Sequence, residues 1–146
     1  MMNILKSCLN GSYSFTQTSK NSKNGNIFST GISVFEPIST EKVRHTKKGS
    51  YILNGQEQEF FQVRYFVFKQ GRVIMEKYEE SLLHEFMIPD NDPSFPITLH
   101  HSHHCNDDIY NITLKILSPD EFQTEYRIKG PKKNEIIQSQ YTRIHQ

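Results

Sequence analysis

The chain has 146 residues, of which 35% are hydrophobic and 23% charged. This length fits a single domain, and 10 Phe and 7 Tyr are too many rings for a disordered polymer. The 17 basic and 16 acidic residues leave a net charge of +1, which provides no long-range field to attract nucleic acid. No apolar run approaches the ~18 residues of a membrane span, and residues 1–9 lack the apolar stretch of a secretory signal. We therefore expect a cytoplasmic protein with no nucleic-acid or membrane partner.

Helical spacing is confined to residues 2–9, where Ile4, Leu5 and Leu9 share one side. From residue 13 to residue 144 the dominant pattern is period two, which places successive side chains on opposite faces of a strand. The expected strands cover residues 11–18, 27–35, 41–47, 50–53, 59–69, 72–78, 82–88, 109–116, 122–129 and 134–143. They are joined by turn formers at Asn24-Gly25, Asn54-Gly55, Gln70-Gly71, Ser118-Pro119-Asp120 and Gly130-Pro131.

Short connections and the absence of crossover helices favour an all-β antiparallel meander over an α/β fold. Closing the meander into an up-and-down barrel of about 8–10 strands removes the exposed edges, although a two-sheet sandwich would give the same alternation. We expect one domain over residues 1–146, with residues 1–10 capping one end and residues 11–144 forming the barrel. The segment Pro89–Ser94, followed by Phe95-Pro96, is expected to be a loop over one mouth.

The segment His100–Cys105 holds four histidines and a cysteine, and imidazole and thiolate both bind zinc. On a strand only His101, His103 and Cys105 share a face, and no distant cluster offers a clean fourth ligand. We therefore favour one or two cavity-facing histidines over a functional metal site, with adventitious metal binding as a further alternative. Cys8 and Cys105 lie far apart in the sequence, and in a reducing compartment two free thiols are expected rather than a disulfide.

Two polar residues interrupt apolar strand faces. His84 shares a face with Phe86, where a histidine is more often a hydrogen-bonded core residue than a catalyst, although its pKa is easily tuned across neutral pH. Arg64 shares a face with Phe66 and Phe68. Its side chain either reaches the surface or lines the lumen, where it would bind a carboxylate or phosphate.

Seven short motifs follow one another along the chain. They are Leu9-x-Gly11-x-Tyr13, Thr30-Gly31-x-Ser33-x-Phe35-x-Pro37, Arg64-Tyr65, Leu83-His84-x-Phe86, His103-x-Cys105-x-x-Asp108-x-Tyr110, Tyr126-x-Ile128-x-Gly130-Pro131-Lys132-Lys133 and Tyr141-x-Arg143. Their order resembles domain-of-unknown-function family 6314 over roughly residues 9–143. The resemblance implies a calycin-like barrel, the architecture of lipocalins and fatty-acid-binding proteins. Tyr13, Val67 and Tyr126 stand where Trp is usual in the family, and the two tyrosines keep the ring volume.

The resemblance also implies a set of polar pocket residues, because these match the family's polar motif positions. They are Arg64, His84, His103, Cys105, Asp108, Tyr110, Lys133, Tyr141 and Arg143. Only a closed sheet would bring these residues together, so we expect many of them to converge at one lumen.

The leading functional hypothesis is the binding of a small anionic or amphipathic molecule in that lumen. Arg64, Lys133 or Arg143 would hold the acidic group, and aromatic rings would supply contact area. One alternative is an enzyme of unknown reaction that uses a His, Asp, Tyr and Arg constellation; another is a non-catalytic subunit or interaction module. No metal or cofactor is expected, and a protein partner is left open.

Overall fold

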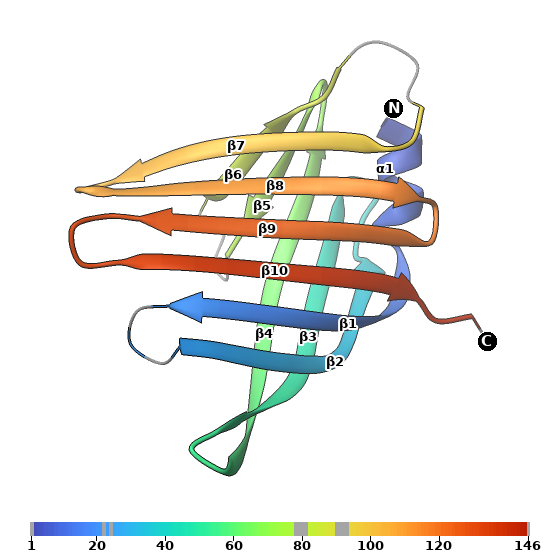
Figure 1. The fold of residues 1–146 in the computed structure, drawn as a ribbon. Coiled ribbons are helices and arrows are strands. Elements are labelled where there is room, and N and C mark those ends of the chain that lie inside the picture. Colours follow the sequence, from blue (N-terminus) through green and yellow to red (C-terminus); the bar gives the residue numbers. More distant parts are fainter. Residues whose placement is uncertain (1, 22, 24, 78–81, 90–93, 146) are drawn as a thin grey trace.

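The computed structural model describes residues 2–21, 23, 25–77, 82–89 and 94–145 as a short helix and one ten-stranded sheet (Figure 1). The elements are α1 (Met2–Cys8), β1 (Gly11–Asn21), β2 (Gly25–Pro37), β3 (Lys42–Leu53), β4 (Gln56–Lys69), β5 (Arg72–Glu76), β6 (Leu82–Met87), β7 (Ile97–Cys105), β8 (Asp108–Ser118), β9 (Glu121–Lys129) and β10 (Asn134–Arg143). The strand order is β6-β5-β4-β3-β2-β1-β10-β9-β8-β7, and every described pair is antiparallel. The predicted all-β meander is therefore confirmed.

The sheet curls into a nearly closed barrel, and the pairing of its first and last strands joins the two halves of the sheet. β1 runs antiparallel to β10 from Tyr13↔Arg143 to Asn21↔Glu135. The two ends of the sheet, β6 and β7, share no backbone ladder among the described residues. Side chains of β6 and β7 meet instead, as at His84 and His101, so the described residues leave a seam between these two strands.

β3 is one strand, and the prediction of two strands at 41–47 and 50–53 is wrong. Gly49 does not form a turn but lies opposite Gly31 of β2. A Cβ on Gly31 would lie 2.0 Å from the carbonyl oxygen of Lys48, so only glycine permits this approach of the two strands. Phe15 on β1 pairs with Gly31, and Phe60 on β4 pairs with Gly49. The centroids of these two rings lie 6.0 Å apart.

β7 is an additional strand that the alternation of apolar residues did not predict. Its run His100–His104 contains no apolar side chain, yet it pairs with β8 throughout, from Ile97↔Ile116 to Cys105↔Asp108. The predicted turn at Asn54-Gly55 is confirmed, with φ of 52° and 78° at its two residues. This left-handed conformation at both central positions fits the twist of a two-residue hairpin. Asn24 and residues 90–93 of the expected mouth loop lie outside the described residues.

α1 lies at one end of the barrel (Figure 1). Leu5 and Leu9 are buried there against the core. Below them Tyr13 and Phe122 meet edge-on at 5.1 Å, and Phe122 stacks on Tyr141 at 4.4 Å. The solid core thus lies at the helix end and is built largely from rings. None of the described helical residues forms a segment that is long and apolar enough to cross a membrane.

Candidate functional site

The barrel holds a cavity of about 450 Å³. Its lining extends from Leu9 and Phe35, beside α1, to Cys105 and Tyr110, near the β7–β8 turn. A cavity of this size lies within the range of roughly 300–1,000 Å³ that small-molecule sites occupy. The low apolar share of the sequence is therefore accounted for by a core that fills only part of the barrel.

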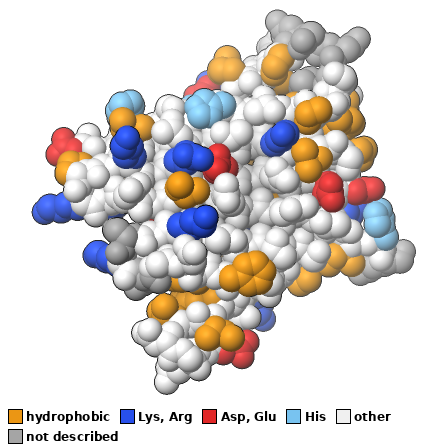
Figure 2. Space-filling model, viewed as in Figure 1, with side chains coloured by type: hydrophobic (Ala, Val, Ile, Leu, Met, Phe, Trp, Pro, Cys, Tyr) orange, Lys and Arg blue, Asp and Glu red, His pale blue; other side chains and the backbone are white. Residues whose placement is uncertain are grey.

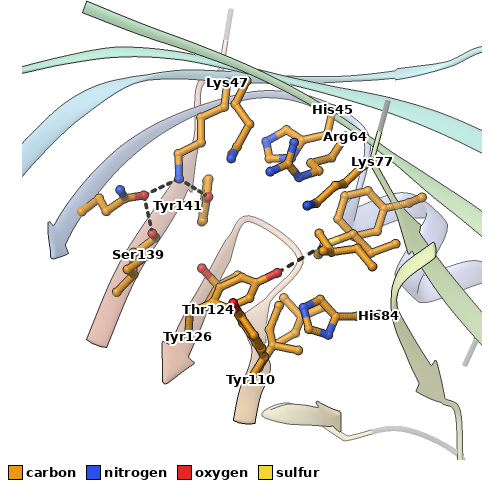
Figure 3. Close-up of a pocket in the computed structure, with 18 of the residues that line it drawn as sticks. His45, Lys47, Arg64, Lys77, His84, Tyr110, Thr124, Tyr126, Ser139 and Tyr141 are labelled. Atoms are coloured by element: carbon orange, nitrogen blue, oxygen red, sulfur yellow. Dashed lines mark hydrogen bonds between the residues drawn. The ribbon is translucent and has the colours of Figure 1, made fainter. Parts of the chain in front are cut away.

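The charged side chains that line the cavity are all basic. They are Lys47, Arg64 and Lys77, and no Asp or Glu is among the described lining residues. Figure 3 shows them on one wall, whereas Tyr110 and Tyr126 extend from the opposite wall. On the face of the molecule shown in Figure 2, by contrast, both acidic and basic side chains are present.

Strand register explains why the basic residues gather. Inward positions alternate along β3, so His45 and Lys47 both face the lumen. His45 pairs with Arg64 on β4, and Lys47 pairs with Gln62. Lys77 directly follows Glu76, the residue of β5 that pairs with Tyr65 of β4. The basic groups therefore come from β3, from β4 and from the residue that follows β5.

Arg64 is half-buried and has most of its donors available to the cavity. Its one hydrogen bond within the described chain runs from Nη1 to the carbonyl oxygen of Val63, at 3.0 Å. Burial lowers the pKa of Arg64, and the nearby Tyr126 opposes this effect. A guanidinium has five N–H donors and stays protonated in proteins. Arg64 can therefore form a bidentate pair with a planar carboxylate or with a phosphate.

Lys47 forms a polar cluster with residues of β1 and β10. Its Nζ donates to the Tyr141 hydroxyl at 2.8 Å and to Gln17 Oε1 at 2.5 Å. Ser139 also donates to Gln17 Oε1, at 2.9 Å. Burial, and then the positive charge of Arg64, lower the pKa of Lys47 to about 7. The amine therefore exchanges between its charged and neutral forms near neutral pH.

His45 lies between the basic residues but adds no charge of its own. Its ring stacks on Phe35 at 4.1 Å, and Nε2 lies 3.0 Å from the Ser33 hydroxyl. Burial, followed by the charges of Lys47 and Arg64, lowers the pKa of His45 to about 3. His45 is therefore neutral at physiological pH.

His84 is a buried residue of the seam, as its apolar strand face indicated. The side chain is 1% exposed, and Nδ1 lies 3.0 Å from Nδ1 of His101 on β7. Its other nitrogen, Nε2, has no hydrogen-bond partner in the described structure. Burial, and then the charges of His101 and His103, lower the pKa of His84 to about 4.

The remaining residues of the histidine run divide by strand face. His103 and Cys105 line the cavity, whereas His100 contacts Thr113 on the outside at 3.1 Å. Within the described residues, no group of three or more His, Cys, Asp or Glu side chains is arranged to hold a metal ion.

Six of the nine predicted pocket residues line the cavity: Arg64, His84, His103, Cys105, Tyr110 and Tyr141. Asp108 and Lys133 do not. They lie at the rim, where Lys133 Nζ is 3.8 Å from Asp108 Oδ2 and 3.3 Å from the Tyr110 hydroxyl.

The expectation that Arg143 binds the acidic group in the lumen does not fit its position, which is outside the cavity lining at the helix end. Its Nε donates to Asp120 at 2.8 Å, and Nη2 donates to the carbonyl oxygens of Ser7 and Pro119 at 3.1 and 3.0 Å. Nη1 donates to the carbonyl oxygen of Asn10. These bonds connect α1 to the β8–β9 turn, so the position of Arg143 fits a role in stabilising the fold.

The sequence did not lead us to predict several of the residues that line the cavity. The most important of these are Lys47, Lys77 and Gln17. One signal could have found Lys47, because it is in phase with Val43 and His45 on the inward face of β3. A lysine at the end of a predicted strand is ordinarily placed in solvent, so the period alone did not single it out.

The antiparallel strands, the N-terminal helix and the lined cavity together define a nearly closed β-barrel with an internal pocket. The chain belongs to DUF6314, a family of unknown function, which it matches over residues 9–143. The resemblance drawn from the motifs is thereby confirmed. No curated protein matches the chain.

Solved structures with the same fold support this class. The S-type phycobiliprotein lyase CPES from Guillardia theta superimposes with a TM-score of 0.74 at 10% identity, over 99% of this chain and 93% of that one. A protein of unknown function from the DUF3598 family of Nostoc punctiforme gives 0.59 at 10% identity, over 99% of this chain and 49% of its own. The barrel EF1p2_mFAP2b, bound to DFHBI, gives 0.53 at 14% identity, over 99% and 100%. At these identities the likeness concerns the fold.

Proposed function

We propose that this protein binds a small organic anion with an apolar or aromatic body inside the barrel. The observation that carries the proposal is the charge of the cavity, which is lined by Lys47, Arg64 and Lys77 and by no described carboxylate. Unpaired positive charges in a low-dielectric cavity are costly. An anionic ligand would supply the opposite charge.

The rest of the lining suits the body of such a ligand. The rings of Phe35, Phe60, Phe66 and Phe122 all face the cavity and offer flat apolar contact area. Polar groups are few and are concentrated on the walls, an arrangement that orients a ligand while most of its surface is buried in apolar contacts. The similar barrel EF1p2_mFAP2b has been solved bound to DFHBI, which supports a small ligand in a fold of this kind.

Paired fluorescent probes test the proposal. 8-Anilinonaphthalene-1-sulfonate carries a sulfonate, whereas N-phenyl-1-naphthylamine has similar rings without the charge. We expect the sulfonate to bind about tenfold more tightly, because one charge-assisted hydrogen bond contributes about 1.5–3 kcal/mol. Titrations of the folded protein at neutral pH and low salt give both dissociation constants. Equal affinities for the two probes would overturn the proposal.

Two arginine variants locate the anion. Arg64→Gln should weaken sulfonate binding about tenfold and leave the neutral probe unaffected. The control is Arg72→Gln, because Arg72 pairs with Glu85 on the outer surface at 2.9 Å. This control should bind both probes like the wild type. Urea unfolding verifies that both variants are folded, and an unchanged sulfonate affinity in Arg64→Gln would place the anion elsewhere.

A further inference from the structure

A buried primary amine lines the cavity from β3. Lys47 is 6% exposed, and its Nζ lies 4.6 Å and 5.1 Å from the ring centroids of Phe15 and Tyr141. No described carboxylate of the cavity lining balances its charge, and Arg64 adds a second positive charge nearby. Desolvation and a neighbouring cation are the two conditions that turn a lysine into a neutral, nucleophilic amine.

We propose that Lys47 forms a reversible imine with the carbonyl group of an anionic aldehyde or ketone bound in the cavity. This inference rests on the proposed function, because the anionic group of the ligand is the part that Arg64 would hold. Lys47 pairs with Gln62, so Arg64 is its diagonal neighbour on β4. Diagonal neighbours across two strands are about 7–8 Å apart. A benzoate with a para carbonyl group is long enough to reach both side chains.

The chemistry needs no oxidant or reductant. The Nζ lone pair forms a bond to the carbonyl carbon, and the carbonyl π electrons move to oxygen, which takes up a proton. The resulting carbinolamine loses a proton from nitrogen and its protonated hydroxyl as water. A C=N bond thus replaces the C=O bond, and one water molecule is released.

Tyr141 is positioned to assist these proton transfers. Its hydroxyl lies 2.8 Å from Lys47 Nζ, and burial raises the pKa of Tyr141, so the phenol stays protonated and able to donate. Lys133 provides the contrast. It is exposed at the rim and hydrogen-bonded to Tyr110, and this bond raises the pKa of Lys133 and favours the unreactive ammonium form.

Reductive trapping tests the inference on the wild-type protein. The protein is incubated at pH 7 with 4-formylbenzoate and sodium cyanoborohydride, and peptide mass spectrometry locates the reduced adduct. We expect modification of Lys47 at least tenfold faster than of Lys133, because a lysine with an ordinary pKa of about 10.4 is almost entirely protonated at this pH. Lys47→Met should abolish the fast adduct. Lys48→Met, the outward-facing neighbour on the same strand, should retain it.

The outcomes separate this inference from the proposed function. If adducts form on exposed lysines with no preference for Lys47, the proposal that Lys47 is the nucleophile is overturned. If non-reactive terephthalate still protects the protein against urea in that case, the anion site stands without the imine. If benzaldehyde modifies Lys47 as fast as 4-formylbenzoate does, the requirement for an anionic group is overturned. The proposal that Lys47 is the nucleophile is then retained.

Discussion

Nδ1 of His84 lies 3.0 Å from Nδ1 of His101, and this contact joins β6 to β7 where the described backbone forms no ladder. A hydrogen bond between two imidazole nitrogens requires that one carries a proton and the other does not. Protonation of both rings replaces the bond with repulsion. The seam of the barrel therefore depends on histidine protonation.

Lowering the pH from 7 to 4 is expected to destabilise the protein. The pKa of His84 is about 4 in the fold against 6.5 as its ordinary value, because of burial and the neighbouring His101 and His103. Between these two values the unfolded chain binds more protons, so the free energy of unfolding falls as the pH falls. The interval corresponds to roughly 3 kcal/mol. His45 adds a loss of the same sign that extends to about pH 3. Urea unfolding at a series of pH values measures this fall in the free energy of unfolding.

His84→Phe isolates the contribution of the seam. The variant lacks one of the two buried titrating rings, so its loss of stability between pH 7 and pH 4 should be about half that of the wild type. His104→Phe is the control, because His104 is exposed on the outer face of the same barrel region. It should show the full wild-type loss. A wild-type stability that is flat between pH 7 and pH 4 would refute this account.

Arg143→Met should destabilise the fold and leave ligand affinity intact. The guanidinium donates to Asp120 and to the carbonyls of Ser7 and Pro119. Losing these charge-assisted bonds should cost about 2–3 kcal/mol in urea unfolding. The control Arg127→Met removes only an exposed pair with Glu125 and should cost less than about 1 kcal/mol. A drop in sulfonate affinity for folded Arg143→Met would show instead that the residue serves the site.

Gly31→Ala should be strongly destabilising for steric reasons. The new Cβ would meet the Lys48 carbonyl oxygen at 2.0 Å and the Gly49 Cα at 2.5 Å, and both are backbone atoms that cannot rotate away. Forcing β2 and β3 apart should cost at least about 2 kcal/mol. Thr30→Ala, at the adjacent outward position, should cost less than about 1 kcal/mol. Similar urea midpoints for the two variants would contradict the close approach of the strands.

Ile137→Trp should fill the cavity and report on it. The chain contains no Trp, so the variant provides a single indole signal. Ile137 lines the cavity from β10, and the larger ring should lower affinity for the aromatic sulfonate at least tenfold without loss of stability. Ile136→Trp is the matched control, because Ile136 is the adjacent residue on β10 and its side chain does not line the cavity. If both variants bind the sulfonate like the wild type, the ligand does not occupy this cavity.

Much of the fold could be predicted because alternation and turn chemistry are local properties. Asn54-Gly55 is an example, since both residues adopt the positive φ that the hairpin needs. Gly49 shows where local reasoning stops. It falls between the two strands expected at 41–47 and 50–53, and only the presence of Gly31 on the neighbouring strand shows that it permits close approach of the strands.

The candidate site was harder to predict. The alternation of residues along a strand shows which face of the sheet a side chain lies on, but not its position along the barrel axis. Tyr141 and Arg143 share the inward phase of β10, yet Tyr141 lines the cavity and Arg143 lies at the helix end. Lys47 was missed for the opposite reason. Its burial is caused by residues of β1 and β10 rather than by any feature of its own segment, and the Tyr141 hydroxyl that contacts it is 94 residues away in sequence.

The pairing of β1 with β10 also has a consequence for how the protein folds. One edge of β1 is covered by β2 early in synthesis, whereas the other edge stays open until β10 has been made. An unpaired edge with alternating apolar residues is a template for association with other chains. The barrel can close only after the last strand leaves the ribosome, so nascent chains stalled before residue 134 should be the form most prone to aggregate.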